Sequence, residues 1–98
     1  MRQIIFSKRA KNELIKLSEY LQLKFSIKVK NEFIDKFEQT IITIKNNPDA
    51  FAKSDRNKYH KAVVTKQTSI FYRFDANKIN IVAVFDTRQN PNKINKTE

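Results

Sequence analysis

The sequence predicts one α+β domain with the element order β-α-α-β-β-β: an N-terminal strand, a two-helix hairpin and a C-terminal antiparallel meander of three strands. Apolar residues recur at helical spacing through residues 8–46, and strand-like runs lie on either side. A chain of 98 residues is the length of a single domain. We expect the helices to pack on one face of the sheet, which buries the apolar side of each layer. The domain is predicted to span residues 1–91, followed by a polar tail at residues 92–98.

The first helix is predicted to begin after Ser7. Residues 2–6 form a short strand-prone run, and a serine that follows such a run can accept a hydrogen bond from a free backbone N–H at a helix start. Apolar residues then recur every three or four positions, as one face of a helix requires. The residues of this face are Ala10, Leu14, Leu17, Leu21 and Phe25.

A second helix is predicted to begin after Ser26 and to end at Asn47-Pro48, because the residue before a proline disfavours helical backbone. Almost no linker separates the two helices, so we expect an αα-hairpin. The wide apolar stripe of the second helix predicts core packing. Its residues are Val29, Phe33, Ile34, Phe37, Ile41, Ile42 and Ile44.

Three strands are predicted at residues 59–65, 69–74 and 78–85, after a polar loop at 49–58. The turns between them fall at residues 66–67 and 75–77, and Asn77 is expected to take a positive φ in a chain without glycine. Residues 79–85 are almost continuously apolar, so we expect the last strand to be central in the sheet and covered on both faces.

The composition excludes several kinds of site. The chain has no cysteine, no glycine and one histidine, which excludes disulfides, thiolate metal sites, multi-histidine metal sites and glycine-rich phosphate loops. We therefore expect no metal and no cofactor. No apolar run approaches the length of a transmembrane helix, and the N-terminal residues lack the pattern of a signal peptide. The expected location is the cytoplasm, without a membrane partner.

The net charge indicates an anionic partner. Twenty Lys and Arg residues against ten Asp and Glu residues give +10 at neutral pH. Such a field attracts phosphate backbones and acidic proteins. Most of the positive residues are lysines, which favours loose attraction to phosphate over bidentate recognition of base edges. A merely solubilising surface is the alternative interpretation.

Many weak features, in their order and spacing, resemble one known family, the RelE/ParE superfamily of toxins from bacterial type II toxin–antitoxin systems. The resemblance covers residues 2–91, and its specificity comes from the whole set of features. They are Ser7 with Ala10, Leu14 and Tyr20, Ser26 with Phe33, Ile41, Ile44 and Asn47-Pro48, Lys61 before Ile70-Phe71-Tyr72-Arg73-Phe74, Ile79-x-Ile81-x-x-Val84, and Asp86-Thr87-Arg88-Gln89-Asn90-Pro91.

The resemblance implies a toxin that an acidic, partly disordered antitoxin wraps and neutralises. Members of the RelE type cut mRNA in the ribosome without a metal, whereas members of the ParE type inhibit DNA gyrase. The long helical region from Ser7 to Pro48 looks more like the ParE type. So does the lack of a Tyr or His after Tyr72, since RelE-like ribonucleases often carry one there.

The resemblance makes Lys61, Arg73 and Arg88 the candidate catalytic or phosphate-binding cations. Lys61 stands where family members commonly carry Arg, Arg73 follows the strand Tyr, and Arg88 follows the last strand. A solvated basic face is the alternative for each residue. The predicted set for binding the target or a nucleic acid is Lys53, Arg56, Lys58, Lys61, Lys66, Arg73, Arg88 and Gln89.

Groups for acid–base catalysis are few. His60 is a weak candidate, because a lone histidine is more often a packing or surface residue. Asp86 is a second weak candidate as a base, but Arg88 beside it is expected to lower the pKa of the carboxyl group. Asp86 and Arg88 are also placed to pair with each other. Tyr72 matches the strand Tyr of the family, which is more usually structural.

The preferred interpretation is a ParE-like toxin that binds an essential target, DNA gyrase at the family level, and whether the chain is an enzyme stays open. One alternative is a RelE-like, metal-free mRNA endoribonuclease that acts on the ribosome. The other is a non-toxic, basic nucleic-acid-binding domain. All three depend on one geometric expectation, namely that folding brings Lys61, Arg73 and Arg88 into a single cradle.

Overall fold

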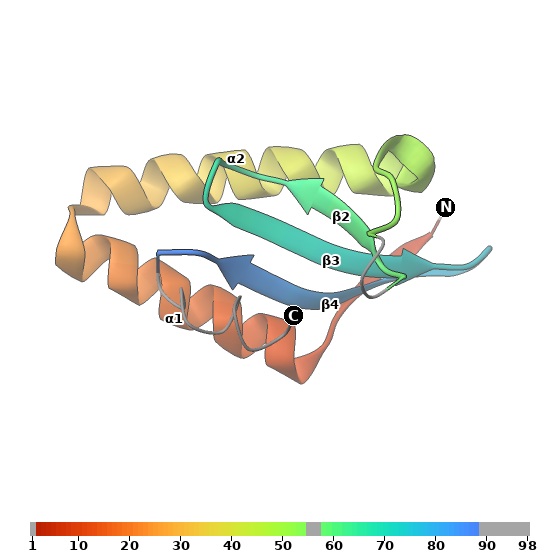
Figure 1. The fold of residues 1–98 in the computed structure, drawn as a ribbon, viewed down its shortest axis with the longest axis horizontal. Coiled ribbons are helices and arrows are strands. Elements are labelled where there is room, and N and C mark those ends of the chain that lie inside the picture. The colour runs from red at the N-terminus through yellow and green to blue at the C-terminus, as the bar shows by residue number, and fades with distance from the viewer. Residues whose placement is uncertain (1, 55–57, 89–98) are drawn as a thin grey trace.

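Two helices cover one face of a four-stranded sheet (Figure 1). The computed structural model describes residues 2–54 and 58–88. The predicted α+β class and element order are confirmed, with a short 3-10 helix where only a loop was expected. The elements are β1 (Gln3–Phe6), α1 (Lys8–Lys24), α2 (Ile27–Asn46), η1 (Pro48–Ala50), β2 (His60–Val63), β3 (Thr68–Phe74) and β4 (Lys78–Asp86).

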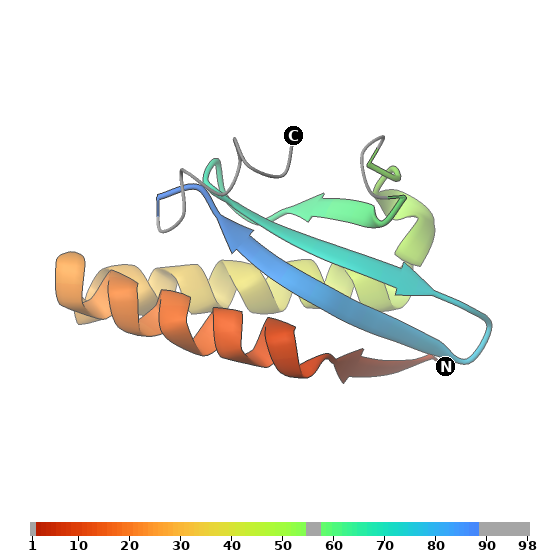
Figure 2. The same cartoon turned by 60° about the horizontal axis from the view of Figure 1, so that its bottom comes forward.

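The sheet is mixed, with the strand order β1-β4-β3-β2. Strands β2, β3 and β4 form the predicted antiparallel meander, whereas β1 pairs in parallel with β4, from Gln3 beside Lys78 to Phe6 beside Ile81. The central position predicted for the last strand is therefore confirmed. Both helices lie on the same face (Figure 2). Within the described ranges no helix or strand covers the other face, so the expectation that β4 is covered on both faces was wrong.

The face of the sheet away from the helices is called the open face below. Side chains alternate between the faces along a strand, and Ala62, Ile70 and Tyr72 are buried under the helices. Their neighbours along the strands therefore belong to the open face. Those neighbours are Lys61, Val63, Ser69, Phe71 and Arg73, with Ala83 paired to Phe71.

A β-bulge explains the continuous apolar run of β4. Phe71 pairs with Ala83 and Tyr72 pairs with Ile81, which leaves Val82 as an extra residue between them. The bulge shifts the alternation of side chains by one position. Ile81 and Val84 are three positions apart, so without the bulge they would point to opposite faces of the sheet. With the bulge between them, both belong to the core under the helices.

The two serine caps were predicted correctly. Ser7 Oγ accepts a hydrogen bond from Ala10 N at 2.9 Å, and Ser26 Oγ accepts one from Val29 N at 3.1 Å. Ser7 Oγ also donates to Val82 O at 2.9 Å. Beyond the end of β1, Glu13 of α1 accepts a hydrogen bond from Val84 N at 3.0 Å. Ser7 and Glu13 thus satisfy backbone groups of β4 that β1 is too short to reach.

The core lies between the helices and the sheet, and most residues of the predicted helical stripes contribute to it. Two expectations were wrong. Phe25 is 53% exposed because it is the C-cap of α1, at the turn between the helices, and Ile42 is 51% exposed on the outer side of α2. The fully buried core side chains include Leu17, Leu21, Ile44, Ile70, Tyr72, Ile79 and Ile81.

The turn between β3 and β4 does not need a positive φ, so the prediction for Asn77 was wrong. Asp75 Oδ1 accepts hydrogen bonds from Asn77 N at 2.8 Å and from Lys78 N at 2.9 Å. A side chain that bonds to the backbone two residues later forms a turn by itself. The described residue with a positive φ is Lys58, at 64°.

Candidate functional site

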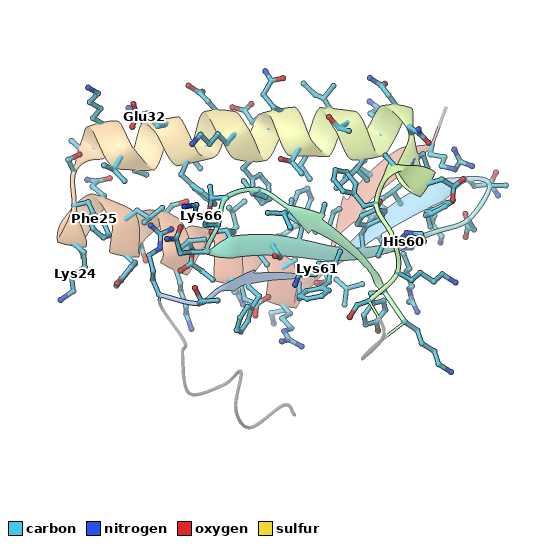
Figure 3. The ribbon with its side chains drawn as sticks, turned by 45° about the horizontal axis from the view of Figure 1, so that its top comes forward. Lys24, Phe25, Glu32, His60, Lys61 and Lys66 are labelled. Atoms are coloured by element: carbon cyan, nitrogen blue, oxygen red, sulfur yellow. The ribbon has the colours of Figure 1, made fainter. Side chains whose placement is uncertain are left out.

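The structure brings together only part of the predicted cationic set. Lys61 and Arg73 both belong to the open face, on the neighbouring strands β2 and β3. Arg88 follows β4 at the opposite end of the sheet, where Asp86 pairs with Thr68 at the start of β3. In Figure 3, Lys61 lies near the middle of the sheet, and Lys66 lies toward the end of the sheet on the side of the turn between the helices. The expectation of one cradle for Lys61, Arg73 and Arg88 was therefore wrong.

Arg88 is held by Asp86, as their spacing suggested. Arg88 Nη2 lies 2.9 Å from Asp86 Oδ2, and Arg88 N donates to Asp86 Oδ1 at 2.9 Å. Thr68 Oγ1 donates to the same carboxylate at 2.5 Å. The guanidinium carbon of Arg88 lies 5.9 Å from the ring centroid of Phe25, a cation–π contact. Arg88 thus ties the end of β4 to the turn of the helical hairpin.

Burial would by itself raise the pKa of Asp86, whose side chain is almost completely enclosed. The hydrogen bonds from Arg88 and Thr68, together with the positive charge of Arg88, outweigh this effect and lower the pKa below its ordinary value. A carboxylate with a lowered pKa is a weak base. Asp86 is consequently suited to holding Arg88 and poorly suited to abstracting a proton.

A second group of predicted residues lines a hollow of about 290 Å³ at the other end of the sheet, called the corner hollow below. The loop after η1 folds back beside β2, where Lys53 forms a bridge with His60 and Lys61 N donates to Ala52 O at 3.1 Å. This fold-back carries the loop lysines to the end of β3. The lining residues are Asp49, Lys53, Lys58, His60, Arg73 and Phe74.

His60 is fixed in the corner hollow through its ring. His60 Nδ1 lies 2.6 Å from Phe51 O, and because a carbonyl oxygen only accepts, Nδ1 carries the hydrogen. The ring centroid lies 5.2 Å from that of Tyr72 and 5.1 Å from that of Phe74. Nε2 is therefore the ring nitrogen left for a ligand or a proton. The fold also brings Arg73 of β3 to the hollow that His60 lines, which the lysines near His60 in the sequence do not indicate.

Tyr72 has the structural role that the resemblance implied. Its side chain is fully buried, and its hydroxyl donates a hydrogen bond to Pro48 O at 2.6 Å. Burial and the nearby negative charge of Asp49 raise the pKa of Tyr72 to about 12. The hydroxyl keeps its proton at neutral pH and anchors η1 to the sheet.

Sequence reasoning missed two lining residues, Asp49 and Phe74. Asp49 follows a predicted helix end and Phe74 lies in a predicted strand, so no local pattern distinguished them. Arg56 and Gln89 of the predicted set lie outside the described residues. Among residues 2–54 and 58–88, no group of three His, Cys, Asp or Glu side chains is arranged to hold a metal, and no helix is long and apolar enough to cross a membrane.

The comparison with protein families gives the class of protein to which this chain belongs. The model of the ParE toxin of the type II toxin–antitoxin system, parDE, matches residues 4–91. The chain belongs to this family, which lies within the RelE/ParE superfamily that the sequence resembles. A comparison with curated proteins gives no match.

Solved structures share the fold at low sequence identity. A chain of the chromosomal ParDE toxin–antitoxin system from P. aeruginosa has a TM-score of 0.73 at 10% identity, over 88% of this chain and 96% of that one. YafQ from E. coli strain BL21(DE3) has a TM-score of 0.62 at 14% identity, over 91% and 97%. YoeB from Staphylococcus aureus, solved as a dimer, has a TM-score of 0.58 at 19% identity, over 86% and 94%.

Proposed function

We propose that this chain is a ParE-like growth inhibitor that binds an essential target, DNA gyrase at the family level, and that a cognate acidic antitoxin neutralises it. The observation that carries the proposal is the match of the ParE toxin family to residues 4–91. The structural neighbour from P. aeruginosa comes from a toxin–antitoxin system. A net charge of +10 favours association with an acidic partner.

The state of two groups, Asp86 and Tyr72, supports an action without hydrolysis. The Asp86 carboxylate is engaged by Arg88 and Thr68, and the Tyr72 hydroxyl is buried against Pro48 O. Neither group is available to exchange a proton with a substrate. Lys61 and Arg73, in contrast, are exposed, and no described carboxylate pairs with them. We assign them to binding an anionic surface of the target.

Expression of the chain without a partner tests toxicity, and a DNA supercoiling assay with purified gyrase tests the target. We expect growth arrest with a DNA-damage response and intact mRNA, and inhibition of supercoiling. Lys61→Gln should weaken this inhibition several-fold at an unchanged unfolding midpoint. Lys24→Gln is the matched control, since it removes the same charge at the end of α1. Arrest with mRNA cut at codon positions would contradict the gyrase target, and no arrest would favour a plain nucleic-acid-binding domain.

A ribosome-dependent endoribonuclease is the second proposal, and the geometry of His60 favours it. The bond to Phe51 O leaves Nε2 for proton transfer, and Lys53, Lys58 and Arg73 line the same hollow as this histidine. Metal-free RNA cleavage needs such a proton-transfer group beside cations that stabilise the phosphate. Under this proposal His60→Gln abolishes mRNA cleavage in translating extracts, whereas under the first proposal no cleavage exists to be lost.

A further inference from the structure

The turn between the helices exposes large apolar side chains. Leu23 at the end of α1 is 84% exposed, Phe25 in the turn 53% and Ile27 at the start of α2 58%. These three residues are called the apolar tip below. They fall within five consecutive residues, whose Cα atoms span at most about 14 Å even in an extended chain. Single apolar residues scattered over a surface are normal, whereas a group of them beside charged residues marks an interaction site.

The apolar tip lies outside the core. Leu21 and Phe33 are buried, and no residue between them in the sequence is. Figures 1 and 2 both show the turn projecting beyond the end of the sheet. Phe25 N and Ser26 N donate hydrogen bonds to Leu21 O at 3.0 and 3.2 Å, so the backbone of the turn is held without the apolar side chains. Core packing therefore does not explain why apolar residues occupy the tip.

Positive charge surrounds the apolar tip. Between Glu19 and Glu32 the charged residues of the sequence are Lys24, Lys28 and Lys30, which are called the basic collar below. Both glutamates lie at least one helical turn away from the nearest residue of the tip. Within the described ranges, none of the three lysines forms a salt bridge. The collar is therefore available to a negatively charged partner.

We propose that the apolar tip and the basic collar bind the surface of an anionic phospholipid bilayer. Exposed apolar side chains enter the boundary between headgroups and acyl chains, and nearby lysines are attracted to the anionic headgroups. Such binding needs no helix that crosses the bilayer, and no helix of the described residues could cross one. The proposal departs from the expectation of no membrane partner, which considered spanning helices and a signal peptide. It goes beyond the toxin action proposed above and requires neither gyrase nor an antitoxin.

The composition of the turn favours a bilayer over a protein partner. A stable protein interface buries about 800 Å² on each partner, and lysine is depleted at its centre. Three apolar side chains on a projecting turn offer less area, and lysines alternate with apolar residues from Leu23 to Lys30. A bilayer has no fixed shape to match, and lysine stems can lie along apolar surface while their charged ends reach the headgroups. A protein contact at the tip is the alternative outcome of the test.

Sedimentation of the full chain with lipid vesicles tests the proposal, with the chain made by cell-free synthesis. The vesicles consist of phosphatidylcholine alone, or of phosphatidylcholine and phosphatidylglycerol in equal amounts. We expect binding to the anionic vesicles that weakens as the salt concentration rises, because salt screens the attraction of the lysines. Binding to phosphatidylcholine alone should be much weaker. No binding to the anionic vesicles at low salt would overturn the proposal.

Variants separate the apolar tip from the overall charge of +10. The double variant Leu23→Ser/Ile27→Ser keeps every charge and should weaken binding at least about tenfold, because two apolar side chains no longer leave water. Ile15→Ser/Ile42→Ser is the matched control, since it removes one exposed isoleucine from each helix, about 12 and 22 Å further from the turn. It should change the affinity less than about twofold. Equal binding by the first variant and the unchanged chain would show diffuse attraction of a basic protein and would overturn the proposal. Thermal unfolding checks that each variant is folded.

A tryptophan reports insertion directly, because the chain contains none. With anionic vesicles, the emission of Leu23→Trp should move to shorter wavelength and be quenched by lipids with brominated acyl chains. Ile42→Trp, on the outer side of α2, should show neither change. Quenching at both positions or at neither, with the protein bound, would overturn insertion of the tip. An emission shift of Leu23→Trp that depends on protein concentration without lipid, and no quenching by the brominated lipids, would assign the tip to a protein contact and would overturn the bilayer as its partner.

Discussion

Tyr72 connects the sheet to η1 through a single buried hydroxyl. Its bond to Pro48 O is 2.6 Å long, and the residue has no exposed surface. Tyr72→Phe keeps the ring and removes the donor, so Pro48 O loses its partner. We expect the free energy of unfolding to fall by about 1 kcal/mol, measured by urea denaturation. Tyr20→Phe on the half-exposed side of α1 is the control and should cost less.

The same substitution tests whether Tyr72 takes part in the activity. A buried hydroxyl whose pKa is raised to about 12 does not exchange protons at neutral pH. Toxic activity per folded molecule should therefore be unchanged in the Tyr72→Phe variant. A loss of activity at an unchanged folded fraction would instead give the hydroxyl a chemical role.

The lowered pKa of Asp86 predicts how the stability of the fold depends on pH. Its pKa is lowered in the folded protein, so its contribution to stability is present above its unfolded pKa, near 3.9, and is lost as the pH falls through the folded pKa. We expect the free energy of unfolding to drop below about pH 4. Asp86→Asn should remove part of this drop and destabilise the protein at pH 7 by about 2 kcal/mol, because Arg88 and Thr68 lose a charged acceptor.

Asp75 is the internal comparison for this pH series. Backbone N–H groups of Asn77 and Lys78 lower its pKa too, but its carboxylate is exposed to solvent. Asp75→Asn should remove a smaller share of the acid dependence than Asp86→Asn. If the two variants behave alike, or if Asp75→Asn has the larger effect, the buried pair of Asp86 and Arg88 is not the main acid-sensitive contact.

At the scale of single elements, the two helix caps differ in what else they hold. Ser26 Oγ bonds only within α2 in the described structure, whereas Ser7 Oγ caps α1 and also donates to Val82 O of β4. Ser26→Ala should cost about 1 kcal/mol of stability, the usual value for a lost N-cap. Ser7→Ala should cost about 2 kcal/mol, since a hydrogen bond to the sheet is lost as well. Chemical denaturation measures both, and a larger loss for Ser26→Ala would contradict this ranking.

The amino-acid sequence predicts best those elements whose boundaries and spacing are set by residues close together in the chain. Both caps, both helices and the antiparallel meander follow from neighbouring residues, and these were correct. The parallel pairing of β1 with β4 has no local signal, because it joins residues at opposite ends of the chain. Asn77 was misjudged because the Asp75 side chain already completes the turn. Phe25 was misjudged because helical spacing does not show where the sheet beneath a helix ends.

The candidate sites were harder to predict than the fold, because their residues come from separate elements that only the folded chain brings together. The corner hollow forms because the loop after η1 folds back along β2. This fold-back brings together Lys53, Lys58, His60 and Arg73, and the spacing of these residues along the chain does not reveal their proximity. Arg88 appeared equivalent to Arg73 in the sequence. The length of β4 carries it to the other end of the sheet, where Asp86 holds it.

At the scale of the whole molecule, the charge of +10 predicts an unusual response to salt. Repulsion between like charges destabilises a compact state, and salt screens it with a Debye length of about 10 Å at 0.1 M. We expect the free energy of unfolding to rise, by an amount of the order of 1 kcal/mol, between low salt and about 0.3 M sodium chloride. Urea denaturation at constant pH measures this change. A fall would mean that attractive ion pairs outweigh the repulsion.

The bond between Ser7 and Val82 spans 75 positions of the chain, and the pairing of β1 with β4 lies alongside it. During synthesis the first strand leaves the ribosome long before its partner exists. Pairing between distant segments also slows folding, because a long loop must close first. A nascent or prematurely terminated copy consequently has no place to dock its first strand. The four-stranded sheet is therefore complete only after β4 has been translated.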